Sequence, residues 1–166
     1  MSCKTAMFVI SCLTFDATTF AQTSLVWPPP LPPGATIQLV APSGPVGASQ
    51  LKKAAQQLEA LGYKVKMRDD VDARHGYLAG ADQRRAAEFN EAFSDPEVDG
   101  VFPLHGGYGA MRILDAIDYD AVRKNPKVVV GFSDTTALHL ALNRHAGLVT
   151  LHSPARPAAR TARRAA

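Results

Sequence analysis

Short apolar runs alternate with amphipathic stretches along the middle of the chain. Five such runs predict strands, over residues 37–41, 63–67, 98–104, 127–132 and 148–151. Between them, apolar residues at helical spacing predict helices over residues 49–61, 82–93, 108–117 and 135–145. Parallel strands need crossover connections, and helices supply them. The pattern therefore predicts an α/β fold with an open, doubly wound, mostly parallel five-stranded sheet.

The two ends of the chain depart from this pattern. Residues 1–24 resemble a weak secretory signal, with a disordered leader as the alternative. Residues 25–34 form a proline-rich lead-in, since proline favours extended backbone. Residues 155–166 contain no apolar side chain larger than alanine, so we expect a disordered Ala/Arg tail. The folded domain is expected over residues 35–154.

Composition and charge narrow the class of protein. A length of 166 residues with 46% hydrophobic content suits one globular domain. Both cysteines lie within the first twelve residues, which excludes a disulfide framework and zinc-finger spacing in the domain. The net charge of +3 comes from four arginines in the tail, so we expect no nucleic-acid partner. The N-terminal apolar run is shorter than the roughly 20 residues of a transmembrane helix.

A glycine-rich loop, His-Gly-Gly-Tyr-Gly at residues 105–109, follows the third predicted strand. Ligands of open parallel sheets bind at the C-terminal ends of the strands. Glycine lets backbone N–H groups approach an anion or an oxyanion closely. The loop matches neither the dinucleotide nor the P-loop phosphate motif. A tight strand-to-helix turn without a ligand is the alternative interpretation.

Ser133 lies where the fourth predicted strand turns directly into a helix. This position suits a nucleophile elbow, and the helix N-terminus would stabilise an oxyanion beside Oγ. The alternative is an ordinary helix N-cap at Ser133 or Asp134. A serine nucleophile also needs a base. His139 is six residues further along the same helix and out of reach of Oγ, whereas His105 and His152 end neighbouring strands and stay open as candidates. No complete triad emerges.

Several motifs stand in order along residues 28–154. They include Val-Ala-Pro-Ser at 40–43, Gly-Tyr-Leu-Ala-Gly at 76–80, Gly-Gly-Tyr-Gly at 106–109 and Gly-Phe-Ser-Asp at 131–134. Together they resemble the N-terminal domain of the LD-carboxypeptidase family, serine peptidases of the murein tetrapeptide carboxypeptidase and microcin C immunity type. The resemblance implies a flavodoxin-like or class I glutamine amidotransferase-like sheet.

The resemblance also implies an activity and roles for individual residues. Enzymes of this family release the terminal D-alanine of murein tetrapeptides during peptidoglycan recycling, and they need no metal or other cofactor. By this resemblance Ser133 is the nucleophile, and the backbone amides of Asp134 and Gly107 form the oxyanion hole. The residues expected to contact the murein peptide are Gly106, Tyr108 and His152.

The chain departs from the family pattern at three points. His105 stands where the family has arginine, and Ser153 replaces the glycine of a His-Gly-Pro motif. The family's catalytic glutamate and histidine come from a C-terminal domain, and no residue here is assigned to them. We therefore expect a truncated carboxypeptidase with little or no activity as this chain. The resemblance implies a cytoplasmic location, and we expect a periplasmic or exported protein only if residues 1–24 are a signal.

Two other functions stay open at this stage. The microcin-immunity branch of the family cleaves acyl-adenylates on the same fold, and the residues that decide its specificity lie largely in the C-terminal half. A non-catalytic module could instead hold a peptide or an anion in the glycine loop. Apolar surface next to that half is expected to favour self-association, including a homodimer.

Overall fold

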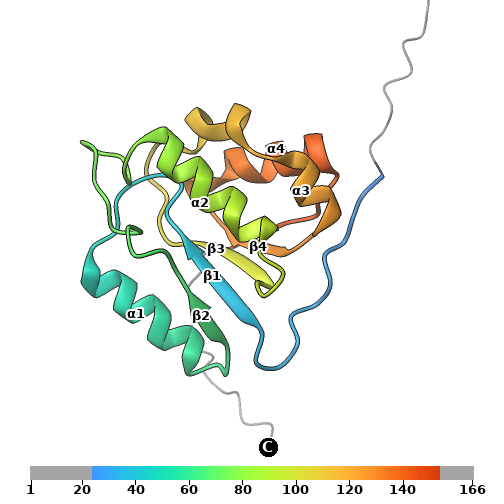
Figure 1. The fold of residues 1–166 in the computed structure, drawn as a ribbon, viewed down its shortest axis with the longest axis horizontal. Helices are drawn as coiled ribbons and strands as arrows, with labels where there is room; N and C mark the ends of the chain where they lie inside the picture. The colour runs from blue at the N-terminus through green and yellow to red at the C-terminus, as the bar shows by residue number, and fades with distance from the viewer. Residues whose placement is uncertain (1–23, 154–166) are drawn as a thin grey trace, which may run out of the picture.

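Five parallel strands form one sheet in the order β2-β1-β3-β4-β5 in the computed structural model, which describes residues 24–153 (Figure 1). This confirms the expected parallel α/β fold. The expected leader, apart from Ser24, and the expected tail lie outside the described residues. The strands are β1 Thr36–Val40, β2 Lys64–Lys66, β3 Gly100–Pro103, β4 Val128–Gly131 and β5 Leu151–His152.

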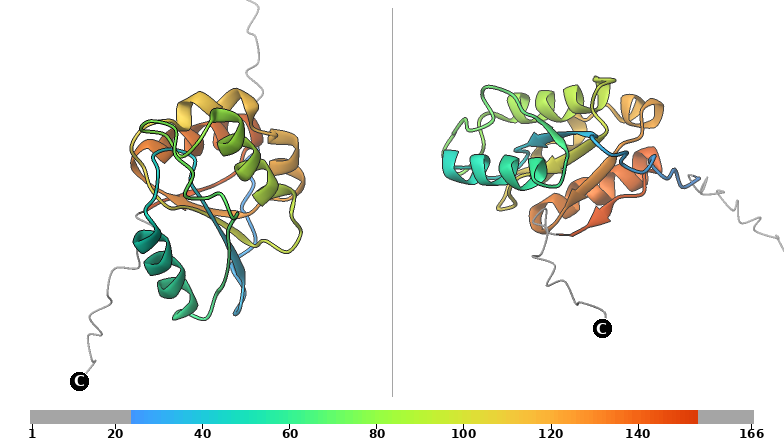
Figure 2. Two further views of the ribbon diagram at one scale, coloured as in Figure 1. Left: turned by 60° about the vertical axis from the view of Figure 1, so that its left-hand side comes forward. Right: turned by 90° about the horizontal axis from the view of Figure 1, so that it is seen from below.

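Helices lie on both sides of the sheet, and Figure 2 shows α1 and α2 on opposite sides of the strands. We call the side covered by α2, α3, α4 and the 3₁₀ helix η1 the closed face, and the side on which α1 packs the open face. The helices are α1 Ala48–Glu59, α2 Asp82–Ser94, η1 Ala110–Ala116, α3 Tyr119–Lys124, η2 Ser133–Thr135 and α4 Thr136–Ala146.

The closed face carries the larger hydrophobic core. Phe89 and Phe93 of α2 are fully buried against strand residues such as Val101. Leu138 and Leu142 of α4 complete the same cluster because they recur at helical spacing. Burying each such side chain contributes about 1.5–3 kcal/mol, so this face dominates the stability of the domain.

The open face is covered over only part of its width. Leu58 of α1 packs in a cluster with Ile37 and Phe102 of the sheet. Further along, Phe132 follows β4 and Leu151 begins β5, and these side chains are 46% and 53% exposed. Both lie on the side of Val130, because strand residues alternate and Leu151 pairs with Val130. Within residues 24–153, no helix packs over this part of the sheet.

The structure differs from the expected elements at three points. The helix expected over 108–117 is wrong in type and extent, since η1 is a 3₁₀ helix that begins at Ala110. The short helix α3, which Asp118 caps by accepting a hydrogen bond from Ala121 N at 2.9 Å, was not anticipated. The last strand lies at Leu151–His152 rather than at 148–151.

Leu148, which was expected in that strand, instead forms a parallel bridge with Val26. Val26 N donates to Gly147 O at 2.8 Å, and Val149 N donates to Val26 O at 2.9 Å. The segment before β1 therefore pairs with the chain just before β5. No helix within the described residues combines the length and the apolar character needed to cross a membrane.

Candidate active site

Ser133 occupies a strained turn between β4 and α4. Its φ of 62° is the only positive φ of a non-glycine residue between positions 24 and 153. An L-residue in this left-handed region costs about 1–2 kcal/mol. The N-cap positions of η2 and α4 are Phe132 and Thr135, and no side-chain capping bond is made at either helix. The N-cap interpretation of Ser133 is therefore wrong, and its side chain is exposed to solvent.

Two side chains, Thr135 of η2 and His139 of α4, form hydrogen bonds with the backbone of this turn. Thr135 Oγ1 donates to Phe132 O at 2.7 Å. A Cβ added at Gly131 would lie 2.7 Å from Thr135 Oγ1, so only glycine fits there. His139 Nε2 lies 3.0 Å from Gly131 O, and because a carbonyl oxygen can only accept, Nε2 carries the proton. Burial lowers the pKa of His139, which keeps the ring neutral.

The glycine loop packs directly against Ser133. A Cβ added at Gly106 would lie 3.1 Å from Ser133 Oγ and 3.5 Å from the backbone nitrogen of Asp134. The carbonyl of Gly106 accepts a hydrogen bond from Gly44 N at 3.0 Å, which ties this loop to the loop after β1. Of the expected site residues, the structure therefore brings Ser133, Asp134 and Gly106 together.

Two polar side chains link the loops around Ser133. Asp134 Oδ2 accepts from Ala110 N at 2.9 Å and so joins the Ser133 turn to the end of the glycine loop. Arg85, which is fully buried, donates to Gly109 O at 2.8 Å and also to Pro42 O. The loops after β1, β3 and β4 are thus fixed relative to one another by hydrogen bonds to buried or half-buried groups.

A second buried charge lies under the loop after β1. Glu88 is fully buried, accepts from Ala41 N at 2.8 Å and pairs with Arg84 at 2.7 Å. Burial raises the pKa of Glu88, opposed by the bonds from Ala41 and Arg84. A buried carboxylate needs hydrogen-bond partners, and Ala41 N and Arg84 are those partners here. These bonds hold the end of β1 against α2.

Gly107 and Tyr108 form the exposed tip of the glycine loop. Gly107 has a φ of 97°, which glycine adopts readily. The Tyr108 ring is half exposed and lies 5.8 Å, centroid to centroid, from the ring of Tyr77. Sequence analysis did not select Tyr77 as a site residue, although it lies in one of the quoted motifs. The two tyrosines form an aromatic surface one residue beyond Gly107.

The histidines do not complete a catalytic pair. His152 Nε2 lies 3.2 Å from Thr136 Oγ1, and its ring packs edge-on against His139. His105 lies exposed in the glycine loop. Within the described residues, no hydrogen bond joins Ser133 Oγ to a histidine. That part of the chain also holds no cluster of metal-ligating side chains.

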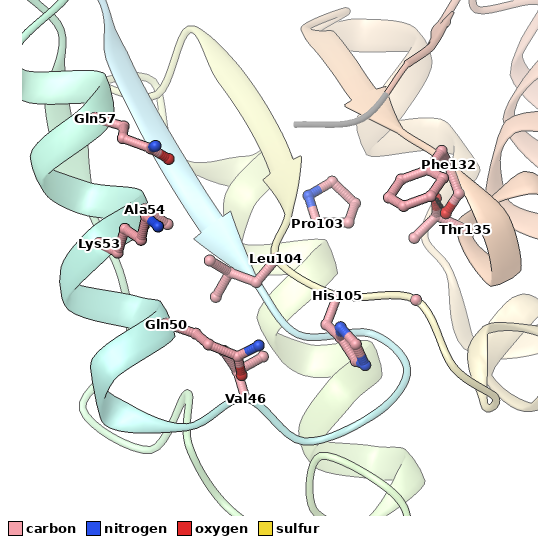
Figure 3. Close-up of a pocket in the computed structure, with 11 residues that line it drawn as sticks. Val46, Gln50, Lys53, Ala54, Gln57, Pro103, Leu104, His105, Phe132 and Thr135 are labelled. Atoms are coloured by element: carbon pink, nitrogen blue, oxygen red, sulfur yellow. Dashed lines mark hydrogen bonds between the residues drawn. The ribbon is translucent and has the colours of Figure 1, made fainter. Parts of the chain in front are cut away.

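A cavity of about 340 Å³ opens beside Ser133 on the open face. Figure 3 shows Gln50, Lys53 and Gln57 on α1 across from Phe132 and Thr135, with the chain that follows β3 between them. Sequence analysis missed the α1 residues, which recur at helical spacing but resemble an ordinary solvated face. The lining residues are Val46, Gln50, Lys53, Ala54, Gln57, Pro103, Leu104, His105, Gly106, Phe132 and Thr135.

Comparisons with known proteins agree on one family. A family model described as the LD-carboxypeptidase N-terminal domain matches residues 37–153. A Bacillus subtilis protein named as a probable murein peptide carboxypeptidase is 42% identical over 76% of this chain and 40% of its own length. The microcin C7 self-immunity protein of Escherichia coli is 32% identical, over 76% of this chain and 38% of that protein.

A solved structure agrees with these sequence matches. The muramoyltetrapeptide carboxypeptidase from Oxalobacter formigenes superposes with a TM-score of 0.67 at 35% identity. The match covers 74% of this chain and 41% of that one. The chain therefore spans about two fifths of the length of the relatives it matches.

Proposed function

The chain belongs to the LD-carboxypeptidase family through the N-terminal domain of that family, and we propose that Ser133 is the nucleophile of a serine carboxypeptidase acting on murein peptides. The observation that carries the proposal is the turn at Ser133. An exposed serine with a φ of 62° at the end of a buried strand has the geometry of a nucleophile elbow. Strain of this kind persists where the surrounding structure over-determines it, as at active sites.

In the proposed reaction, Ser133 Oγ attacks the carbonyl carbon of the amide bond before the terminal D-alanine. A base takes the hydroxyl proton, and the carbonyl oxygen becomes an oxyanion. The backbone amides of Asp134 and Gly107 are the proposed donors to that oxyanion. The C–N bond then breaks, the base returns the proton to the departing amine of D-alanine, and water hydrolyses the remaining serine ester.

The base in this proposal comes from outside residues 24–153. His139 donates its Nε2 proton to Gly131 O, and His152 is hydrogen-bonded to Thr136. The remaining three fifths or so of each relative, which this chain does not span, is the proposed source of the base. The domain described here would then supply the nucleophile and the oxyanion donors.

A chimaera tests the proposal. Residues 37–153 replace the matching segment of the Bacillus subtilis relative, and D-alanine release from disaccharide-tetrapeptide is measured. We expect activity that Ser133→Ala lowers at least about 10³-fold, since removing a triad nucleophile removes most of the rate. Ser49→Ala, on the exposed first turn of α1, is the matched control and should leave the rate unchanged.

Two results would contradict this proposal. An active Ser133→Ala chimaera would remove the role of Ser133, and robust D-alanine release by the 166-residue chain alone would place the base within it. Acyl-adenylates remain the second substrate class, supported by the similarity to the microcin C7 self-immunity protein. The same chimaera assayed on both substrates distinguishes the two.

Two finer expectations belong to the same proposal. Phe132 and Leu151 leave apolar surface on the open face, which favours a homodimer. Size-exclusion chromatography of the full chain checks this, and a monomer at all concentrations would contradict it.

A cytoplasmic location, proposed from the family, is checked by fractionation of the source cells.

A further inference from the structure

The glycine loop depends on contacts from outside itself for its shape. Gly107 and Gly109 have φ values of 97° and 135°, and glycine has a wide choice of backbone conformations. Gly107 and Tyr108 are also exposed at the tip of the loop. The proposed oxyanion donor Gly107 N lies in this segment. Its direction is therefore decided by the groups that hold the two ends of the loop.

The first end of the loop is held by the loop after β1. Gly44 N donates to Gly106 O at 3.0 Å. The C=O and N–H groups of a trans peptide point in opposite directions, and no peptide between positions 24 and 153 is cis. The N–H of Gly107 therefore points away from Gly44. This bond orients the proposed donor, but it involves no atom of the Ser133 turn.

The other end of the loop is held at one peptide group, between Gly109 and Ala110. Gly109 O accepts from Arg85 at 2.8 Å, and Ala110 N donates to Asp134 Oδ2 at 2.9 Å. The guanidinium and the carboxylate lie on opposite sides of this peptide, because its C=O and N–H point in opposite directions. Hydrogen bonds to charged groups are the stronger ones, so they fix the orientation of the peptide. Of the two charged groups, only Asp134 belongs to the Ser133 turn.

The 3₁₀ helix η1, which begins at this peptide, has other contacts that hold it in the fold. Ile113 is buried in the closed-face core. Arg112 pairs with Asp82 of α2 at 2.8 Å. Asp134, by contrast, is only partly buried. Loss of its carboxylate should therefore release the peptide without unfolding η1.

We propose that the carboxylate of Asp134 is a positioning group for the oxyanion hole: it holds the Gly109–Ala110 peptide and so keeps Gly107 N in place relative to Ser133 Oγ. This inference rests on the proposed function, in which Gly107 N is an oxyanion donor. Asp134 then contributes twice, directly through its backbone N–H and indirectly through its carboxylate. A substitution that removes the carboxylate keeps the backbone N–H, so the two contributions can be separated.

Backbone amide hydrogen exchange in the full chain tests the contact itself. Asp134→Ala removes the acceptor, whereas Asp134→Asn keeps an oxygen that can accept. Asp118→Ala is the matched control, since Asp118 accepts from Ala121 N, also at 2.9 Å, at the start of α3. We expect Asp134→Ala to speed exchange at Ala110 at least about tenfold and to shift the amide signal of Gly107. Asp134→Asn should restore both, and Asp118→Ala should affect Ala121 alone.

The chimaera described above tests the consequence for the reaction. Asp134→Ala should lower kcat about 10–100-fold and change KM less than about twofold, because oxyanion donors act on the transition state and not on the bound substrate. Asp134→Asn should recover kcat to within about threefold of the parent, and Asp118→Ala should leave kcat and KM unchanged. Rates are compared at a temperature at which circular dichroism shows every variant folded, so that unfolding does not imitate the effect.

Three results would overturn the inference. The first is an unchanged Ala110 exchange rate and Gly107 signal in Asp134→Ala. The second is a Ser133-dependent chimaera in which Asp134→Ala keeps the parent kcat, which leaves the proposed function standing. The third is an equal fall of kcat in Asp134→Ala and Asp118→Ala. If the parent chimaera is inactive, the proposed function fails, and the Ala110 and Gly107 amides alone decide whether Asp134 holds the loop.

Discussion

The two faces of the sheet differ in how completely they are packed. On the closed face, Phe89, Leu138 and their neighbours form one continuous core under four helical segments. On the open face, α1 covers the sheet near Ile37 and Phe102, while the surface beyond it carries exposed Phe132. The cavity lies where α1 stops covering this face. Dense packing therefore fixes the loops from one side, and the incompletely covered side leaves room for a ligand.

The two faces therefore differ in role: one contributes mainly to stability, and the other lines the cavity. The hydrogen bonds that fix the Ser133 turn come from His139 of α4 and from Thr135 of η2, which also lines the cavity. The cavity on the open face is lined by α1 on one side and by residues at the ends of β3 and β4 on the other. A substitution on one face should therefore change stability, and one on the other should change binding.

The largest expected effect contrasts two phenylalanines. Phe89→Ala on the closed face should lower the free energy of unfolding by about 3–5 kcal/mol, because it opens a cavity in a full core. Phe132→Ala should lower it by less than about 1 kcal/mol, since that side chain is 46% exposed. Urea unfolding of both variants measures the difference. If Phe89→Ala does not fold, Phe89→Leu is the milder substitution to compare. Equal losses in the free energy of unfolding at positions 89 and 132 would contradict the difference between the two faces.

A smaller effect of opposite sign is expected at the Ser133 turn, which lies between the two faces. Ser133→Gly should raise the free energy of unfolding by about 1 kcal/mol, because glycine adopts a φ of 62° without the penalty of Cβ. Ser133→Ala keeps Cβ and should be nearly neutral. Thermal unfolding of the two variants checks this. A Ser133→Gly variant no more stable than Ser133→Ala would show that the turn is not strained.

The smallest expected effect is a pH dependence that arises at His139. Burial lowers its pKa below 6.5, so the unfolded chain binds a proton more readily than the folded one. Stability from this group is complete above pH 6.5 and is lost as the pH falls toward the lower folded pKa. Protonation would also place a proton on Nδ1, which has no partner among the described residues. His139→Gln should reduce the loss in urea midpoint between pH 8 and 5.5.

His75→Gln serves as the control for that experiment. His75 is exposed, and only its backbone is hydrogen-bonded within the described residues, to Leu78. This variant should retain the pH dependence of the parent. If His75→Gln reduces the pH dependence of the urea midpoint as much as His139→Gln does, that dependence comes from the overall charge of the chain and not from the buried His139 ring.

Most of the fold was predictable because the strands and long helices have local patterns. The exceptions depend on contacts distant in sequence. The stretch after Tyr108 looked like one helix, but Gly109 adopts a φ of 135°, and Asp134, far along the chain, binds Ala110 N. A 3₁₀ helix follows, and Asp118 then caps the separate helix α3. The Asp118 cap was visible in the sequence, whereas the bond from Asp134 was not.

The location of the candidate site was predictable, and its extent was not. Ser133 follows a buried strand, a local signal that the sequence carries, and its proximity to Gly106 follows from the parallel sheet. The contribution of α1 was hidden, because Gln50 and Lys53 resemble a solvated helix face until the sheet is seen uncovered beside them. Tyr77 was likewise hidden, since its contact with Tyr108 joins two separate loops.

The bridge between Val26 and Leu148 has a consequence for the order of events during synthesis. Val26 finds its backbone partners, Gly147 and Val149, only about 120 residues later in the chain. At roughly 5–20 residues per second, a ribosome needs on the order of 6–24 s to make that stretch. Until then the segment before β1 is held by no strand partner and is open to chaperones or to a processing protease. The bridge can close only after Val149 has been made, two residues before β5 begins at Leu151.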